Sequence, residues 1–181
     1  MSSASPAKAF DFDFDRDGLL ADYDKRISKK LGHRYLAGSH YYDLVENESY
    51  ARYSKNTVVR LKSGIAHKEV QKFLAAYDLS DYEYQCWYIG YGDDDYCEWH
   101  IDTRPAEYCE NASRVNIFLT GKSYTEFRSG KVEYEQAVVP VMHEEHRFDN
   151  RKKPKRVMLQ LAIKGLSHNE LCDIIFFTHY K

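Results

Sequence analysis

The β-rich part of this sequence begins with Tyr82-Glu-Tyr-Gln-Cys-Trp-Tyr-Ile-Gly-Tyr91, an aromatic run that ends at the acidic loop Gly92-Asp-Asp-Asp95. Short strand-like runs separated by turn residues follow it, at 97–103, 113–120, 124–128, 131–139, 145–149 and 155–163. Several short strands at this spacing favour a sandwich or barrel over alternating β-α units. The sequence therefore predicts a mainly β body with flanking helices.

Segments with helical periodicity precede the β-rich part of the chain. Apolar residues recur at helical spacing over residues 17–31, and Gly32 is placed as a stop. Residues 56–62 predict a strand, and a second helix is expected over residues 63–77. The order is therefore helices first and then strands.

Both ends of the chain carry local patterns. The alternating stretch Asp11-Phe-Asp-Phe-Asp15 favours a short edge strand or a docked arm. Ser167-His-Asn-Glu170 has the capping-box pattern and predicts a C-terminal helix. We expect one domain over residues 1–181, with an arm and supporting elements at 1–81, the β core at 82–165 and a helix at 166–181.

Composition narrows the class of protein. The chain has 181 residues, 26 Lys+Arg, 28 Asp+Glu and a formal net charge of −2. This balance argues against nucleic-acid affinity that rests on neutralising many phosphates. Apolar runs such as Ala137–Met142 are far shorter than the roughly 20 residues of a membrane helix. The start of the chain lacks an apolar signal region, so the cytoplasm is expected, where cysteines without a C-x-x-C pair are free thiols.

His100-Ile101-Asp102 is the first stretch whose residues suggest a chemical role more than a packing role. Residues i and i+2 of a strand share a face, so this imidazole and carboxylate can point at one ion. Alone the pair is weak, because H-x-D arises by chance and a surface pair would simply be solvated. His146 follows Asp102 by 44 residues, which is enough chain for strands to fold back and bring it beside the pair.

An arginine follows His146 along the chain. Arg156 stands ten residues after His146 and opens a strand on whose face Met158 and Gln160 also lie. Two imidazoles and one carboxylate leave open positions on an octahedral ion, as in non-haem Fe(II) oxygenases. Arginine can grip a carboxylate through two parallel hydrogen bonds. His143 is the rival for the distal ligand, but it lacks an Asn four residues later.

Together these residues resemble the pattern of the Fe(II)/2-oxoglutarate-dependent oxygenases, which is H-x-D, a distal His often in H-x-x-x-N, and then an Arg. Here the pattern reads His100-Ile-Asp102, His146-Arg-Phe-Asp-Asn150 and Arg156, within about residues 82–165. The resemblance implies a double-stranded β-helix, the jelly-roll or cupin-like core, buttressed by N-terminal helices. It also implies that His100, Asp102 and His146 hold Fe(II), and that Arg156 binds the far carboxylate of 2-oxoglutarate.

Three further roles come from looser similarity. Asn116, in Ser113-Arg-Val-Asn-Ile-Phe-Leu119, is similar to an Asn that faces the cosubstrate in some small bacterial members. Tyr88 resembles an early-strand Tyr that hydrogen-bonds the same molecule, with Tyr91 or Tyr96 as alternatives. Arg114 would share a strand face with Asn116, so it is the first candidate for a substrate carboxylate, ahead of Arg104 and Arg128.

The resemblance implies hydroxylation of an unactivated C–H bond, with O2 consumed and succinate and CO2 as co-products. We expect a small-molecule substrate, such as an amino acid or a natural-product intermediate, and no membrane partner. Three alternatives stay open. The first is a protein- or nucleic-acid-modifying oxygenase of the same superfamily. The second is a cupin-like metalloenzyme without 2-oxoglutarate, and the third is a non-catalytic β-sandwich binding module.

Overall fold

The structure is a computed structural model that describes residues 7–29, 33–35, 54–61, 63–100, 112–120, 122–135, 137–140, 144–151 and 153–177, with the backbone alone at 33–35, 54–55 and 123. Its helices are α1 (Arg16–Ser28), α3 (Ile65–Ala76) and α5 (His168–Phe177). Its strands are β1 (Ala7–Phe10), β2 (His33–Tyr35), β3 (Ser54–Leu61), β4 (Tyr84–Tyr91), β5 (Tyr96–His100), β6 (Ala112–Phe118), β7 (Ser123–Phe127), β8 (Gly130–Tyr134), β9 (Ala137–Pro140), β10 (His146–Asp149) and β11 (Arg156–Lys164).

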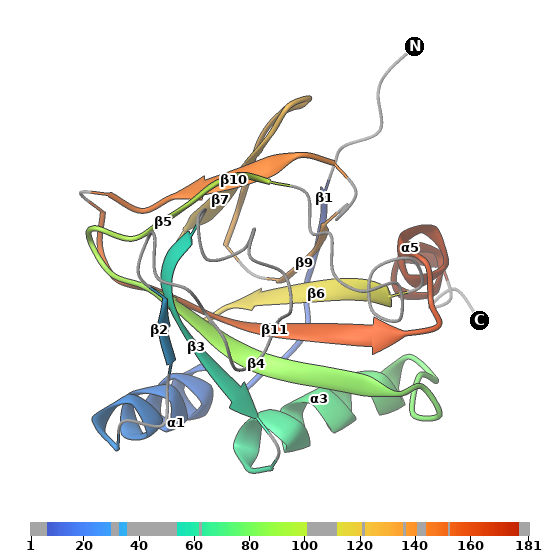
Figure 1. The fold of residues 1–181 in the computed structure, drawn as a ribbon. Helices are drawn as coiled ribbons and strands as arrows, with labels where there is room; N and C mark the ends of the chain where they lie inside the picture. Colours follow the sequence, from blue (N-terminus) through green and yellow to red (C-terminus); the bar gives the residue numbers. More distant parts are fainter. Residues whose placement is uncertain are drawn as a thin grey trace.

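The strands form two facing antiparallel sheets. The larger sheet has the order β1-β9-β6-β11-β4-β3, with β2 also on β3, and the smaller has the order β5-β10-β7-β8. β3 pairs β4 over Thr57–Leu61 and pairs β5 at Ser54 and Lys55, so it joins the two sheets. In Figure 1 the smaller sheet lies above the larger one. Two antiparallel sheets joined in this way form a jelly-roll, which confirms the double-stranded β-helix predicted from the sequence.

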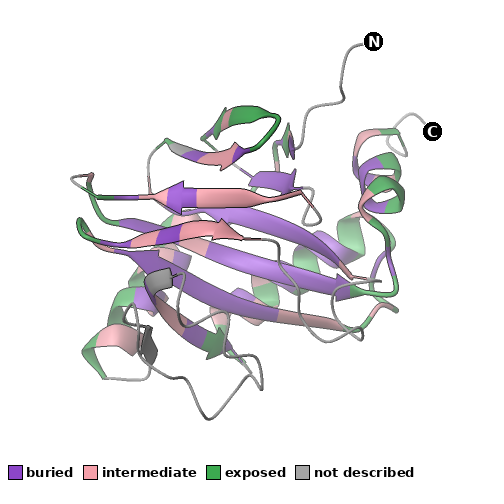
Figure 2. Cartoon of the chain, turned by 45° about the horizontal axis from the view of Figure 1, so that its top comes forward, coloured by how far each residue is buried: buried purple, intermediate pink, exposed green. Residues whose placement is uncertain are grey.

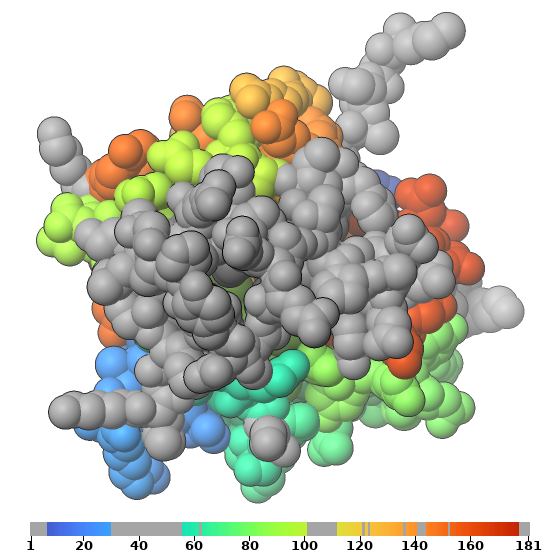
Figure 3. All heavy atoms as spheres, viewed as in Figure 1, coloured from blue at the N-terminus to red at the C-terminus, as the bar shows by residue number. Residues whose placement is uncertain are grey.

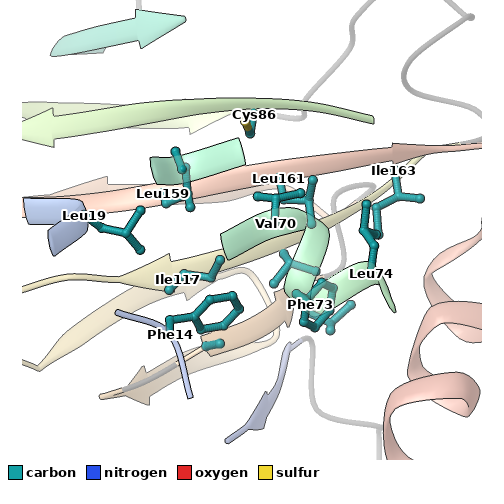
Figure 4. Packing of buried hydrophobic residues seen from close by; sticks show 14 of the residues in the cluster. Phe14, Leu19, Val70, Phe73, Leu74, Cys86, Ile117, Leu159, Leu161 and Ile163 are labelled. Carbon is teal, nitrogen blue, oxygen red and sulfur yellow. The ribbon is translucent and has the colours of Figure 1, made fainter. Parts of the chain in front are cut away.

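Strand alternation divides the larger sheet into two faces. On β11, Leu159 and Leu161 join the main hydrophobic cluster, whereas Met158 and Gln160 face the smaller sheet. Helices α1 and α3 cover the first face (Figure 1), and Figure 4 shows Leu19 and Phe73 from them among the strand side chains. Most of β4, β6 and β11 is buried (Figure 2). The helices therefore leave the opposite face of this sheet for a site.

The molecular surface also separates the smaller sheet from the helices that cover the larger sheet. In Figure 3 the elements of the smaller sheet lie at the top, while α1 and α3 lie at the bottom. α5 contacts β6, β9 and β1 near one end of the larger sheet. No helix in the described part of the chain is long and apolar enough to cross a membrane.

The N-terminal stretch at 11–15 is a docked arm and not an edge strand. It follows β1, which pairs with β9 at the edge of the larger sheet. Phe12 and Phe14 lie 5.3 Å and 5.8 Å, centroid to centroid, from the ring of Phe73 on α3. The alternation seen in the sequence therefore places both aromatic rings against α3, while Asp11 and Asp13 stay exposed.

Helix α1 approaches the sheet closely at one residue of β4. A Cβ atom built on Gly90 would lie 1.9 Å from the hydroxyl oxygen of Tyr23. The ring of Tyr23 packs edge-on against Tyr88, at 5.7 Å between centroids. Glycine at position 90 is therefore what allows α1 to lie this near to the sheet.

The single strand predicted over 131–139 is wrong. The chain instead forms β8, which pairs β7 in the smaller sheet, and then β9, which pairs β6 and β1 in the larger one. The strand ends at Tyr134 because the chain crosses from one sheet to the other between 134 and 137. The helix predicted to residue 31 likewise ends at Ser28, followed by a turn at Lys29.

The C-terminal capping box is confirmed. The Ser167 backbone N–H donates to the Glu170 carboxylate at 2.8 Å, and the Glu170 N–H donates to the Ser167 hydroxyl at 3.3 Å. These reciprocal bonds satisfy two amide groups at the start of α5. Cys86, Cys97 and Cys172 are buried free thiols, as expected, and Cys109 lies outside the described residues.

Candidate active site

A cavity of about 60 Å³ lies between the two sheets. One wall comes from the inward faces of β4, β6 and β11, and the other comes from β5, β7 and β10. His100 and His146 project from the smaller sheet, while Asn116, Arg114 and Gln160 project from the larger one. The remaining lining is mainly apolar, as is usual for a pocket that binds a small molecule.

His100 and His146 meet across neighbouring strands. They are directly paired in the register of β5 and β10, and their ring centroids lie 4.4 Å apart. Directly opposed residues of an antiparallel pair project on one side of the sheet, so both imidazoles reach the cavity. The predicted partnership of these two histidines therefore has a simple structural origin in strand pairing.

Hydrogen bonds fix the tautomer of both rings. Nδ1 of His100 lies 2.7 Å from the carbonyl oxygen of Glu98, and Nδ1 of His146 lies 2.8 Å from that of Glu144. A carbonyl oxygen only accepts, so each Nδ1 carries a proton and the Nε2 of each neutral ring has the lone pair, with Cys97 Sγ 3.7 Å from that nitrogen in His100. This carbonyl-held imidazole is the usual arrangement of a metal-binding histidine.

The third expected ligand, Asp102, lies outside the described residues, and so do His143 and Arg104. Within the described ranges, no group of three His, Cys, Asp or Glu side chains that could hold a metal ion is gathered. The structure therefore brings together the two imidazoles of the expected triad. The carboxylate remains a prediction from the H-x-D spacing.

Arg156 carries a buried positive charge against the cavity wall. Its side chain is 6% exposed, and its guanidinium carbon lies 4.2 Å from the ring centroid of Phe148, which lines the cavity. It donates one long hydrogen bond of 3.4 Å to the carbonyl of Tyr124. Burial lowers the pKa of this guanidinium from its usual value.

No carboxylate among the described residues forms an ion pair with Arg156. A buried charge that no described carboxylate balances is costly, so this position favours an anion supplied by a ligand. The site thus combines two imidazole lone pairs in the cavity with the guanidinium of Arg156, which packs against Phe148 in the cavity wall. That donor set fits a metal ion together with a dicarboxylate that chelates the ion at one end and reaches Arg156 at the other.

Three polar side chains form a hydrogen-bonded row on the larger sheet. Arg114 donates to the Gln160 carbonyl oxygen at 2.8 Å, and the Gln160 amide donates to the Asn116 carbonyl oxygen at 2.8 Å. The Arg114 guanidinium also lies 5.5 Å from the ring of Trp87. The cavity wall therefore includes both Asn116 and Arg114, the residues expected to face the cosubstrate and the substrate.

The structure places Tyr88 away from this cavity. Its ring is 0% exposed within the main hydrophobic cluster, and its hydroxyl donates to Asp22 on α1 at 3.1 Å. Tyr91, three residues on, has the opposite strand parity and lines the cavity, with its ring 4.3 Å from Phe148. A contact between Tyr88 and a molecule in the cavity is therefore excluded by the side of the sheet on which it lies.

Sequence reasoning assigned no role to Gln160 or Phe148. Both were visible in the strand alternation, because Gln160 follows Arg156 by four residues and Phe148 follows His146 by two. A lone polar residue within an otherwise apolar strand was the signal for Gln160. Arg128, an alternative substrate contact, pairs instead with Glu145 on the surface at 2.7 Å.

Comparison by sequence finds no matching family model. It also finds no matching curated protein. Comparison of structures finds a Pseudomonas putida prolyl-4-hydroxylase, with a TM-score of 0.58 and 13% identity, covering 89% of this chain and 92% of that one. This protein has the prolyl hydroxylase fold. The similarity confirms, at the level of the fold, the resemblance to Fe(II)/2-oxoglutarate oxygenases.

Two further structures with this fold align over most of the chain. The viral collagen prolyl hydroxylase of Paramecium bursaria Chlorella virus-1, solved as a 2OG complex, has a TM-score of 0.57 and 12% identity, covering 90% of this chain and 97% of that one. A Trichoplax adhaerens prolyl hydroxylase, in complex with a hypoxia inducible factor peptide fragment, has a TM-score of 0.57 and 11% identity, covering 83% and 78%. Each shares the architecture and little sequence.

Proposed function

We propose that this protein is an Fe(II)- and 2-oxoglutarate-dependent dioxygenase that hydroxylates an unactivated C–H bond of a small molecule. The overall change converts C–H, O2 and 2-oxoglutarate into C–OH, succinate and CO2. The observation that carries the proposal is the meeting of His100 and His146 in a cavity against whose Phe148 wall the buried guanidinium of Arg156 packs. When bound, Fe(II) and 2-oxoglutarate supply the oxidising power, by coupling O2 reduction to decarboxylation.

Under this proposal, the residues of this chain would bind Fe(II) and 2-oxoglutarate and orient them. Nε2 of His100 and of His146, with the carboxylate of Asp102, would hold Fe(II). Arg156 would hold the far carboxylate of 2-oxoglutarate through charge-assisted hydrogen bonds. The aromatic rings of Phe148 and Tyr91 would exclude water around that carboxylate, which would strengthen its attraction to the guanidinium.

The substrate would occupy the other end of the cavity, where Arg114 and Asn116 line the wall. The first candidate is a small molecule, such as an amino acid or a natural-product intermediate, whose carboxylate Arg114 in the cavity wall could bind. A peptide is the second candidate, because the similar Trichoplax adhaerens enzyme was solved with a peptide fragment. Stimulation of succinate formation by free amino acids and by short peptides containing the same residues would separate the two.

The first experiment measures succinate. Protein purified without O2 is mixed with Fe(II) and 2-oxoglutarate, O2 is admitted, and succinate is quantified with and without the substrate panel. We expect Fe(II)-dependent succinate that falls at least about a hundredfold in His146→Gln and in Arg156→Met. His168→Gln on α5, a residue that does not line the cavity, is the control and should keep full activity.

The measurements of iron binding and of succinate distinguish the ways in which this proposal can fail. Iron binding without succinate under any condition would replace this proposal with a cupin-like metalloenzyme that needs no 2-oxoglutarate. No iron binding in the unsubstituted protein would replace it with a non-catalytic binding module. Iron binding that survives in His146→Gln would remove this histidine from the ligand set.

A further inference from the structure

Arg114, Gln160 and Asn116 are buried side chains in one row on the cavity wall, with exposures of 4%, 6% and 8%. They belong to neighbouring strands, since Gln160 of β11 is paired in register with Asn116 of β6. Two hydrogen bonds of 2.8 Å link them in the order Arg114, Gln160, Asn116. The row is therefore part of the sheet and not a flexible surface cluster.

The hydrogen bonds of this row can run in only one direction, from Arg114 through Gln160 to Asn116. Arginine has donors and no acceptor, so the atom of Gln160 that faces Arg114 must be its carbonyl oxygen. The Gln160 amide nitrogen then faces Asn116 and can only donate, so Asn116 must present its own carbonyl oxygen to it. The Asn116 amide nitrogen is thereby directed away from Gln160.

Each acceptor of this row already accepts one hydrogen bond from within the row. The carbonyl oxygens of Gln160 and Asn116 each accept a hydrogen bond from the preceding member, while the Asn116 amide nitrogen bonds to no described residue. We infer that this wall binds its ligand through a carboxylate or carbonyl oxygen and discriminates against an ammonium group, because Arg114 and Gln160 orient Asn116 with its N–H groups toward the cavity. This inference rests on the proposed function only in placing the substrate in the same cavity.

Gln160 is a positioning residue under this inference. Gln160→Glu keeps the shape of the side chain but replaces its donor with an acceptor. The introduced carboxylate would accept from Arg114 and also from the Asn116 amide, which would turn the Asn116 carbonyl oxygen toward the cavity. Its ion pair with Arg114 satisfies both charges, so this variant should stay folded. Gln160→Met removes the row without adding charge and serves as the second variant.

The test measures the binding of two probes of similar size and opposite charge, propionate and protonated propylamine, to the metal-free full-length chain by ligand-observed NMR. Arg156→Met is the background, because it removes the other buried guanidinium that could hold propionate. We expect propionate to bind that background at least about tenfold more tightly than propylamine. The preference should vanish in Gln160→Glu and fall at least about threefold in Gln160→Met.

A second readout separates orientation from charge repulsion. The Asn116 side-chain amide resonances should shift on adding propionate to the background protein, and should not shift in Gln160→Glu even at saturating probe. Equal binding of both probes, no binding of either, or a preference that survives in both Gln160 variants would each overturn the inference. Succinate formation is measured separately, so loss of the proposed reaction with an intact propionate preference would leave the inference standing.

Discussion

Arg156 keeps a full charge among aromatic rings, with one long hydrogen bond to a backbone carbonyl. No described carboxylate pairs with it, and replacing buried charged side chains with apolar ones of similar volume is often neutral or stabilising. We expect Arg156→Met to raise the free energy of unfolding by about 1 kcal/mol and to weaken 2-oxoglutarate binding about a hundredfold. Urea denaturation and anaerobic calorimetric titration measure the two effects.

The control for that variant is Arg128→Met, which removes an exposed ion pair with Glu145 and a surface contact with the ring of Trp99 at 3.9 Å. It should leave 2-oxoglutarate binding unchanged and alter stability little, because exposed charge pairs contribute little to folding. Unchanged 2-oxoglutarate affinity in Arg156→Met would contradict the assigned role. A large loss of stability would instead show that the guanidinium is a structural element of the core.

Tyr88 and Tyr91 form a matched pair that tests the two faces of β4. Tyr88→Phe removes the hydrogen bond to Asp22 beneath the sheet and should lower the free energy of unfolding by about 1 kcal/mol without affecting 2-oxoglutarate binding. Tyr91→Phe, on the cavity side, should weaken 2-oxoglutarate binding about three- to tenfold. The reverse pattern would mean that Tyr88 reaches the ligand after all.

At the scale of elements, the docking of α1 on β4 depends on having glycine, which has no side chain, at position 90. Gly90→Ala would force its Cβ against the hydroxyl of Tyr23, and we expect a loss of about 2–3 kcal/mol in urea denaturation. Tyr23→Val in the same chain should reduce the cost of Gly90→Ala by at least about 1 kcal/mol. Gly92→Ala is the control, because its Cβ would meet only Asp95, at an ordinary 3.6 Å.

The turn between β10 and β11 joins the distal histidine to Arg156 and carries an acid-sensitive pair. Hydrogen bonds from Arg151 lower the pKa of Asp149 from 3.8 to about 2. The folded-state pKa is depressed, so this stabilisation is present above about pH 4 and is lost as the pH falls toward 2. Asp149→Asn should therefore flatten the dependence of unfolding free energy on pH in that range. An unchanged slope would show that the pair does not form in solution.

Strand alternation explains which parts of the site could be predicted. β11 and β10 each show which residues share a face, so Arg156, Gln160 and His146 could be placed from spacing alone. β4 is buried on both faces from Cys86 to Tyr91, so apolar character cannot tell Tyr88 from Tyr91. The break between β8 and β9 was also hidden, because the chain changes sheets there and both sheets accept the same β-prone residues.

At the scale of the whole molecule, each sheet contains one of the two tryptophans. Trp87 lies on β4 of the larger sheet and Trp99 on β5 of the smaller one. We expect one domain, so the single-tryptophan variants Trp87→Phe and Trp99→Phe should each unfold in urea with one transition, at the same midpoint by fluorescence and by circular dichroism. Two separated midpoints within one variant would show that the sheets unfold independently.

β11 is the last strand along the chain, yet it lies in the middle of the larger sheet, between β6 and β4 (Figure 1). While the chain is being synthesised, β4 and β6 therefore emerge from the ribosome with open edges that no earlier residue can cover. Unpaired edges of apolar strands are the usual starting points of aggregation. The yield of properly folded protein in the cell should thus depend on how quickly residues 156–164 follow, which makes this short segment the closing step of folding as well as the support of Arg156.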